Sequence, residues 1–209
     1  MYALTYKKKS KVSTTLAYVF KHKWLALFFA LGCYQFSHGI YIFAKAEFAQ
    51  YLISNAWHKT LQDEQQHPPW PWADTYPVAE LHFNHNDWYV LAGASGRNLA
   101  FAPTHVSATP LPGEIGNSVI VGHRDTQFND LKNIQQGDVI EVKTSGQRQK
   151  FQVSSLRIAH QSQVELMYDD SMSNEYNSDK ATLILITCYP FDSVVPNPTH
   201  RYIVRAVAI

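Results

Sequence analysis

The chain has 209 residues, of which 45% are hydrophobic and 17% are charged. This length and composition suit one ordinary domain with a substantial core plus an appendage, and they exclude a disordered chain and a fibre. The formal net charge of +1 gives no reason to expect a nucleic-acid partner.

The small net charge conceals two oppositely charged parts of the chain. Residues 1–46 contain seven Lys and no acidic residue, whereas residues 47–209 contain eleven basic and seventeen acidic residues, so the two parts carry +7 and −6. An asymmetry of this kind is typical of a membrane segment or a charged tail. We interpret it as the sign of a membrane segment near the N-terminus.

The stretch Trp24–Phe43 is mostly apolar. Twenty helical residues reach about 30 Å, which is the thickness of the hydrocarbon core of a bilayer. Six Lys precede this stretch and only two follow it closely, so the positive-inside rule predicts a cytoplasmic N-terminus. We therefore expect a basic cytoplasmic tail over residues 1–23 and a single transmembrane anchor over residues 24–46.

Three alternatives to a retained anchor have weaker support. The sequence Ala44–Ala46 is an A-x-A cleavage site, but the apolar run is longer than the 7–15 residues of a usual signal peptide. Cys33 resembles the cysteine of a lipoprotein cleavage site, yet Ala30 stands where a large aliphatic residue is usual. A buried helix of a soluble domain does not explain the flanking lysines.

The next segment changes from a helical pattern to a proline-rich one. Within residues 47–62 the apolar positions have a loosely helical spacing: Phe48, Leu52, Ala56 and Leu61. Residues 65–72 are rich in Pro and Trp, which predicts an extended, semi-rigid linker whose Trp pair lies either on the domain or at the membrane surface. Together, residues 47–78 are expected to form a helical extension and a Pro-rich linker.

From about Ala79 onward the sequence consists of short β-like runs. They are rich in Val, Ile, Leu and Tyr, and Gly, Pro, Asn or Asp clusters bound them: 88–92, 118–122, 138–143, 150–159, 182–189 and 201–208. A brief helical element is expected around 129–134. Residues 79–209 therefore predict a small all-β barrel with little helix.

The two cysteines do not form a predicted disulfide. Cys33 lies in the proposed membrane helix, so Cys188 is left as a single unpaired thiol in an exported domain, where thiols are usually oxidised. Pro190 cannot donate to a β-ladder and should end the strand, which puts the thiol where a substrate can reach it. A buried, inert cysteine is the alternative interpretation.

An arginine is expected beside this thiol. If the runs 182–189 and 201–208 pair antiparallel, the end of the first lies beside the start of the second, so Cys188 and Arg201 become neighbours. Arg205 shares the same face but lies four residues deeper, and the strand pattern leaves the choice between the two open. A guanidinium near a thiol supports the thiolate and can hold a carbonyl oxygen as its charge grows.

His123 is the strongest candidate for a proton carrier because it follows a predicted strand, and Asp125 could orient its ring. His200 is a second candidate because it adjoins the arginine. His82 and His85 have a metal-like spacing, but no acidic or thiol partner lies close in the sequence, so a zinc site is disfavoured. The order His, Cys, Arg in a β domain favours a thiol acyltransferase over a binding domain.

Three separated segments carry a resemblance to a known family: 117–126 (NSVIVGHRDT), 182–190 (TLILITCYP) and 201–204 (RYIV). In this order and spacing the chain resembles the sortases, in particular the class GN or marine proteobacterial type. Residues 91–97 and 109–117 support the match, which covers about residues 80–209.

The resemblance implies an eight-stranded sortase-type β-barrel with short helices over 79–209, behind an N-terminal transmembrane helix. It implies a cysteine transpeptidase or endopeptidase that cleaves an LPXTG-like sorting signal. By position, Cys188 matches the nucleophile, His123 the general acid/base and Arg201 the arginine that holds substrate and oxyanion. Thr187 and Tyr189 are expected to contact substrate.

The expected partners are a protein with a C-terminal LPXTG-like signal and an amine acceptor or water, with no cofactor, no metal and no nucleic acid. The expected location is a bacterial inner (cytoplasmic) membrane, with the catalytic domain periplasmic or extracytoplasmic. One alternative is a catalytically silent, membrane-tethered β domain that binds envelope proteins. Another is a cysteine transpeptidase of peptidoglycan peptides, which the absence of an SHGC-type sequence disfavours.

Overall fold

A computed structural model of the chain describes residues 23–84, 86–163, 180–193 and 197–209. The chain divides into two compact units, one that ends at Glu47 and one that spans Phe48–Ile209. Apart from Lys23, the predicted basic tail lies outside the described residues.

The first described element is the long helix α2 (Lys23–Asp63), which begins in the first unit. Its apolar side chains before Glu47, such as Trp24, Phe36 and Phe43, are largely exposed. The helix is long enough and apolar enough to cross a membrane, as judged by length and composition. The anchor predicted over residues 24–46 lies within this helix.

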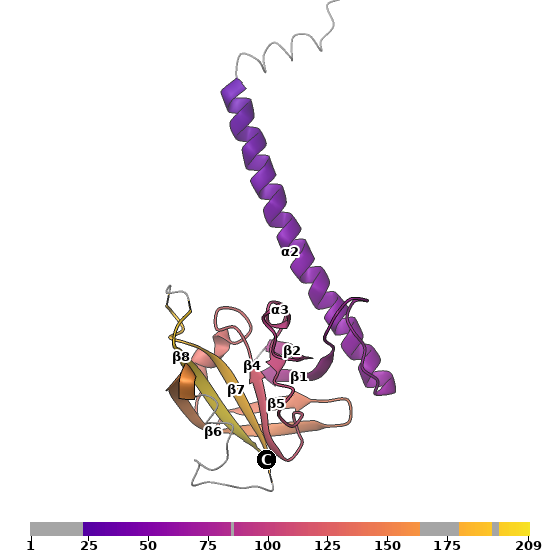
Figure 1. The fold of residues 1–209 in the computed structure, drawn as a ribbon, viewed down its shortest axis with the longest axis vertical. Coiled ribbons are helices and arrows are strands. Elements are labelled where there is room, and N and C mark those ends of the chain that lie inside the picture. The colour runs from indigo at the N-terminus through magenta and orange to yellow at the C-terminus, as the bar shows by residue number, and fades with distance from the viewer. Residues whose placement is uncertain (1–22, 85, 164–179, 194–196) are drawn as a thin grey trace, which may run out of the picture. The chain divides into compact units, whose positions relative to one another are not determined.

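The second unit is a closed β-barrel with short helices (Figure 1). Its described strands are β1 (Pro77–Phe83), β2 (Asn86–Ala92), β3 (Thr104–His105), β4 (Gly116–Val121), β5 (Val139–Lys143), β6 (Arg148–His160), β7 (Ala181–Tyr189) and β8 (His200–Ala208). Helix α3 (Gly96–Leu99) and the 3-10 turns η1 (Asn129–Asn133) and η2 (Gln161–Gln163) connect them. Around the barrel the order is β1-β2-β3-β4-β7-β8-β6-β5, which confirms the predicted eight-stranded fold.

Strand β7 lies between β4, to which it is parallel, and β8, to which it is antiparallel. Its residues from Ala181 to Thr187 are all buried, because both of its faces are covered. Leu183 and Leu185 belong to the large core cluster inside the barrel. Since side chains alternate along a strand, Ile184 and Ile186 point to the other face.

On that other face, apolar residues of neighbouring strands form a second, smaller cluster, here called the outer cluster: Val119, Ala159, Ile184, Ile186 and Ile203. Cys188 follows Ile186 by two residues and therefore shares its face. The outer cluster thus fixes the β4, β7 and β8 backbones directly beside the cysteine.

The C-terminal end of α2 belongs to the barrel unit and packs on it. Ile53 and Trp57 are fully buried, and Ile53 contacts Leu91 of β2. Burying a side chain of this size contributes about 1.5–3 kcal/mol. The indole Nε1 of Trp57 also donates a hydrogen bond of 3.2 Å to Glu80 of β1.

The Pro-rich stretch also lies partly on the barrel. The ring of Trp70 packs edge-on against Phe101, with 5.0 Å between the ring centroids, and both border the cluster around Leu91. Trp72 is 82% exposed. One member of the Trp pair therefore docks on the domain.

Strand β3 ends in a buried histidine. The Nε2–H of His105 donates to the carbonyl of Pro110 at 2.9 Å and lies 3.1 Å from the hydroxyl of Thr109. Burial lowers the pKa of His105 below its ordinary value of 6.5, while the Pro110 carbonyl and Glu114 act in the opposite direction. The neutral imidazole therefore holds the β3–β4 connection together.

We expect His105 to make the barrel less stable in acid. Because its pKa is lowered in the folded state, the unfolded chain takes up a proton first as the pH falls below about 6.5. The stability is thus complete above that pH and declines below it, towards the folded pKa. Thermal unfolding at pH 7.5 and pH 5.0 should show a smaller decline for His105→Gln than for the native chain, and 1 kcal/mol corresponds to about 2–4 °C in a domain of this size.

An equal decline in both proteins would contradict this role of His105. His82→Gln is the matched control, because that imidazole is exposed and pairs with the exposed carboxylate of Asp87.

Candidate active site

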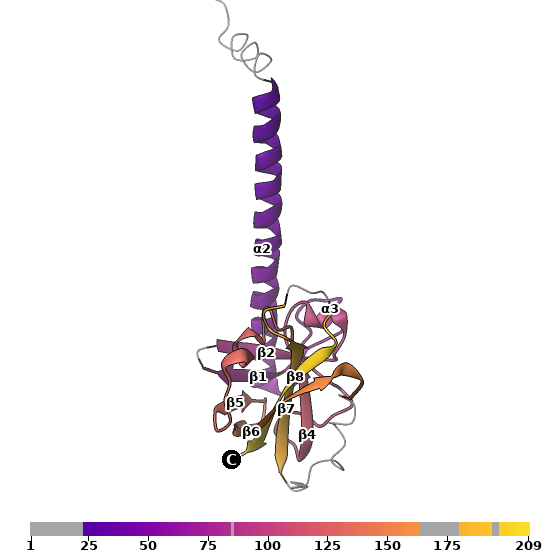
Figure 2. The ribbon, with the colours of Figure 1, turned by 90° about the vertical axis from the view of Figure 1, so that its left-hand side faces the viewer.

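Cys188 and Arg201 lie side by side at one end of the barrel. They are paired residues of the antiparallel strands β7 and β8, and both side chains are partly exposed. Figure 1 and Figure 2 show these two strands next to each other. Arg205 is opposite Ile184 instead, so the register puts Arg201, and not Arg205, beside the thiol.

His123 reaches the same end of the barrel by a different route. The parallel pairing of β4 with β7 matches Val121 with Ile186. It extends one residue further, since the Gly122 N–H donates to the Ile186 carbonyl at 3.1 Å and the Thr187 hydroxyl donates to the Gly122 carbonyl at 2.8 Å. The next residue on β7 is Cys188, and the next residue after Gly122 is the exposed His123. Three segments distant in sequence therefore bring a thiol, an imidazole and a guanidinium to the same end of the barrel.

Glycine is required at position 122 because the Phe128 ring lies close to its backbone. A Cβ atom on Gly122 would lie only 2.8 Å from the ring of Phe128, which is fully buried in the barrel core. The Phe128 N–H in turn donates to the His123 carbonyl at 2.9 Å. The turn that carries His123 is thus folded tightly over the Phe128 ring, and only glycine fits before the histidine.

The guanidinium of Arg201 is held by the segment before β8 and by η2. Its Nη1 donates to the carbonyls of Pro198 (2.6 Å) and His200 (2.9 Å), and its Nη2 donates to the side-chain oxygen of Gln161 (3.2 Å). These contacts fix the guanidinium at the end of the barrel where Arg201 pairs with Cys188. Gln161 has no counterpart among the residues that the sequence pattern singled out.

The residues on either side of Cys188 point away from it. Thr187 is 2% exposed and uses its hydroxyl on the Gly122 carbonyl, so it ties β7 to the turn that carries His123. Tyr189 stacks on Tyr202, with 6.3 Å between ring centroids, and meets Phe191 edge-on. Burial and the neighbouring Tyr189 raise the pKa of Tyr202. Substrate contact by Thr187 and Tyr189 stays a prediction.

Asp125 has a different partner from the one expected. Its carboxylate accepts a hydrogen bond of 3.1 Å from Nε of Arg124, and its side chain is 70% exposed. A role for Asp125 in orienting His123 stays a prediction. Arg124 is a residue that the sequence analysis missed, because an arginine beside an aspartate looks like an ordinary surface pair.

His200, the second histidine considered, lies next to Arg201 on the other face of the sheet, because consecutive residues of a strand alternate. Its ring meets His160 of β6 edge-on at 5.6 Å, and its Nδ1 is 3.2 Å from the Thr199 hydroxyl. The geometry therefore favours His123 over His200 as the partner of Cys188.

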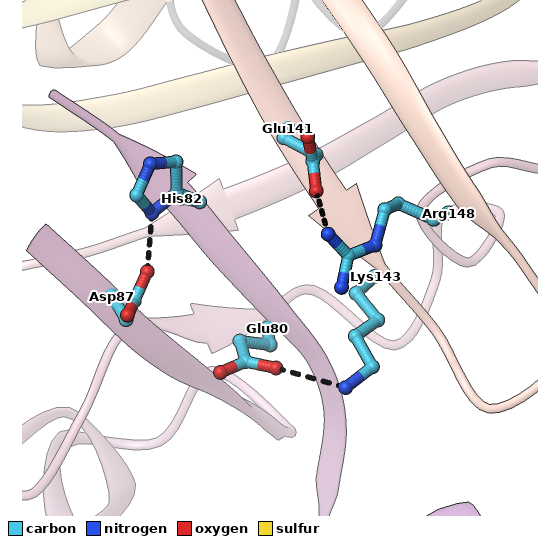
Figure 3. Close-up of a pocket in the computed structure, with 6 residues that line it drawn as sticks. All are labelled: Glu80, His82, Asp87, Glu141, Lys143 and Arg148. Atoms are coloured by element: carbon cyan, nitrogen blue, oxygen red, sulfur yellow. Dashed lines mark hydrogen bonds and ion pairs between the residues drawn. The ribbon is translucent and has the colours of Figure 1, made fainter.

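A polar cavity of about 300 Å³ lies elsewhere, on β1, β2, β5 and β6. Its lining consists of three pairs of polar side chains in contact (Figure 3): His82 with Asp87, Lys143 with Glu80, and Arg148 with Glu141. Each charge is already matched within the cavity, and none of the strands beside Cys188 contributes to it. We therefore do not assign the chemistry to this cavity.

His82 and His85 are the two histidines with a metal-like spacing in the sequence. The His82 ring is paired with Asp87, and His85 lies outside the described residues. Among the described residues, no group of three or more His, Cys, Asp or Glu side chains could hold a metal ion.

The barrel that carries Cys188, His123 and Arg201 resembles known proteins. Residues 81–209 match the sortase domain family. The chain belongs to the sortase family. Sortases are cysteine transpeptidases, so the family agrees with a site built around a partly exposed thiol.

Individual relatives give the same result. The chain is 30% identical to Sortase D of Bacillus subtilis (strain 168) over 115 residues, which are 55% of this chain and 54% of that one. The match thus spans about half the length of this relative. The finer class GN assignment stays a prediction.

Solved sortase structures share the fold. Sortase D5 from Clostridium perfringens superposes with a TM-score of 0.60 at 19% identity, over 78% of this chain and 99% of that one. Sortase A from Corynebacterium diphtheriae superposes with a TM-score of 0.56 at 23% identity, over 66% and 63% of the two chains. At these identities the likeness concerns the fold alone.

Proposed function

We propose that the chain is a membrane-anchored sortase that cleaves an LPXTG-like sorting signal through a thioester on Cys188. The observation that carries the proposal is the strand register, which pairs Cys188 with Arg201 and leads His123 to the same end of the barrel. A silent binding domain has no use for these three groups at one point.

In the first half-reaction, the Cys188 thiolate attacks the carbonyl carbon of the Thr in the signal and a C–S bond forms. Negative charge grows on the carbonyl oxygen, where Arg201 and the backbone N–H near Tyr189 donate hydrogen bonds. His123 as imidazolium protonates the departing amine, so that the peptide C–N bond breaks and a thioester remains.

In the second half-reaction, the incoming nucleophile attacks the thioester. Neutral His123 accepts its proton, a new C–N bond forms with an amine acceptor, and the C–S bond breaks to return the Cys188 thiolate. With water in place of the amine, the product is a carboxylic acid and the reaction is proteolysis.

The anchor belongs to the same proposal. The exposed apolar part of α2 before Glu47 would cross the inner membrane, with the lysine-rich residues before it in the cytoplasm and the barrel outside. A sorting signal at the C-terminus of an exported protein would then meet Cys188 on the outer side.

The test is to incubate the full chain, in detergent micelles, with LPXTG-type peptides and to search for the acyl adduct by mass spectrometry. We expect a mass increase on the peptide that contains Cys188, and its removal by hydroxylamine, which attacks thioesters. If a panel of sorting-signal peptides leaves Cys188 unmodified, while a thiol reagent still reaches it, the silent binding domain becomes the better interpretation.

A further inference from the structure

One cation of the site is buried and has no part in the chemistry proposed above. Arg124 follows His123 directly, and only 7% of it is exposed. Its Nη1 donates to the carbonyl of Pro190 and its Nη2 donates to the carbonyl of Ser193 at 2.6 Å. Pro190 and Ser193 belong to the loop that begins immediately after the Cys188–Tyr189 end of β7.

We propose that Arg124 is a positioning residue that clamps the loop after Cys188 onto the turn that carries His123. The proposal rests on the proposed function, since it concerns the same site. In the described residues, the hydrogen bonds of the Arg124 guanidinium do not go to the Cys188 thiol or the His123 imidazole. Arg124 acts through the two backbone segments that it joins, the turn at His123 and the loop at 190–193.

The charge of Arg124 makes the clamp strong. An arginine is always protonated in proteins, and a buried charge must be compensated by hydrogen bonds or by an opposite charge. Its Nη1 and Nη2 donate to the two loop carbonyls, and its Nε donates to the exposed Asp125. If the loop moved away, the guanidinium would keep only the bond to Asp125 among its partners in the described residues, so the arrangement with the loop in place is favoured.

The shape of the guanidinium matters as much as its charge. Its planar, rigid fork presents donors in fixed directions, whereas a lysine ammonium is a compact point charge on a flexible stem. Pro190 and Ser193 are three residues apart, and their carbonyls are held by two different nitrogens of one group. A lysine at position 124 can keep the charge but cannot reproduce both contacts at once.

The clamp has a consequence for the reaction. The N–H groups near Tyr189 and the imidazole of His123 must keep their places around the Cys188 sulfur while the bonds change. A misplacement of about 1 Å in such an arrangement costs about 100-fold in rate. Because the clamp acts on the placement of the Cys188 and His123 segments, we expect the loss in kcat and little change in KM.

The experiment compares the full-length native chain with Arg124→Lys and Arg124→Gln. We expect kcat to fall by about 100-fold in Arg124→Gln and by at least 10-fold in Arg124→Lys, with KM within threefold of the native value. Amide hydrogen exchange of the peptide that covers 189–193 should become faster in both variants. Circular dichroism reports whether the barrel remains folded.

Arg148→Lys is the matched control, because Arg148 is an exposed arginine that pairs with Glu141 on β5. It should leave kcat, KM, the exchange of 189–193 and the circular dichroism unchanged. Native kcat in both Arg124 variants, or a lowered kcat without faster exchange in 189–193, would overturn the clamp. Loss of the folded barrel in both variants would overturn it too, in favour of a purely structural role. Failure of the native chain to form the Cys188 adduct would instead reject the proposed function.

Discussion

Cys188→Ala should abolish formation of the acyl-enzyme and lower turnover of an LPXTG-type peptide by about 10⁴-fold or more. Removing the nucleophile of a covalent mechanism leaves only binding and oxyanion stabilisation, and losses of this size are usual when a nucleophile is deleted. The measurement is peptide cleavage by the full chain in micelles, together with the mass of the intact protein after incubation. The alanine fits the space, since Cys188 lies at the partly exposed end of β7.

Cys33→Ala is the control for this experiment. Cys33 is the other free cysteine among the described residues and is exposed on α2, so its removal tests whether the effect is specific to one thiol. We expect native turnover from Cys33→Ala. Substantial turnover by Cys188→Ala would mean that the chemistry does not pass through a thioester at this position.

Arg201→Gln should lower kcat by about 10²–10³-fold, which is the usual effect of removing one group that stabilises a developing oxyanion. Arg201→Lys should be intermediate, because the charge stays but the fork that bonds the Pro198 carbonyl through Nη1 and Gln161 through Nη2 is lost. Single-turnover acylation, followed by quenching and mass spectrometry, separates this step from release of the product.

Arg205→Gln tests whether the position of the arginine matters or only its positive charge. Arg205 lies on the same strand and face, but the register pairs it with Ile184 instead of Cys188. We expect its acylation rate to stay within about threefold of the native rate. If Arg205→Gln and Arg201→Gln lower the rate equally, the positive charge acts through the general field of the sheet and not on the oxyanion.

The sequence predicted those strands whose burial gives a clear pattern. The run 182–189 is buried on both faces in β7, so it appears as a nearly continuous apolar stretch. Strand β3 has only two residues and therefore has no period to detect. Strand β1 was also missed, because Pro77, Ala79 and Glu80 give it little of the Val, Ile and Tyr enrichment that marks the other runs.

Within the candidate site, the sequence pattern predicted some contacts and missed others. The pairing of Cys188 with Arg201 follows from the antiparallel arrangement of β7 and β8, which a short connection between two strands favours. The approach of His123 depends on a parallel pairing of β4 with β7, whose intervening chain includes two further strands. The contacts of Arg124 could not be predicted from the sequence, because its partners are backbone carbonyls 66 and 69 residues away.

The packing of the end of α2 on the barrel decides where the chain can be truncated without exposing its core. The sortase family match begins at residue 81, but the compact unit begins at Phe48. A fragment that starts at the family boundary lacks Ile53 and Trp57, which are fully buried against the barrel.

Such a fragment would present the apolar surface around Leu91 and Ala102 to water, and surfaces of this kind promote aggregation. The boundary of homology and the boundary of folding are therefore different places in this chain. A water-soluble form of the enzyme should be truncated just before Phe48, so that the last turns of the helix stay with the barrel they cover.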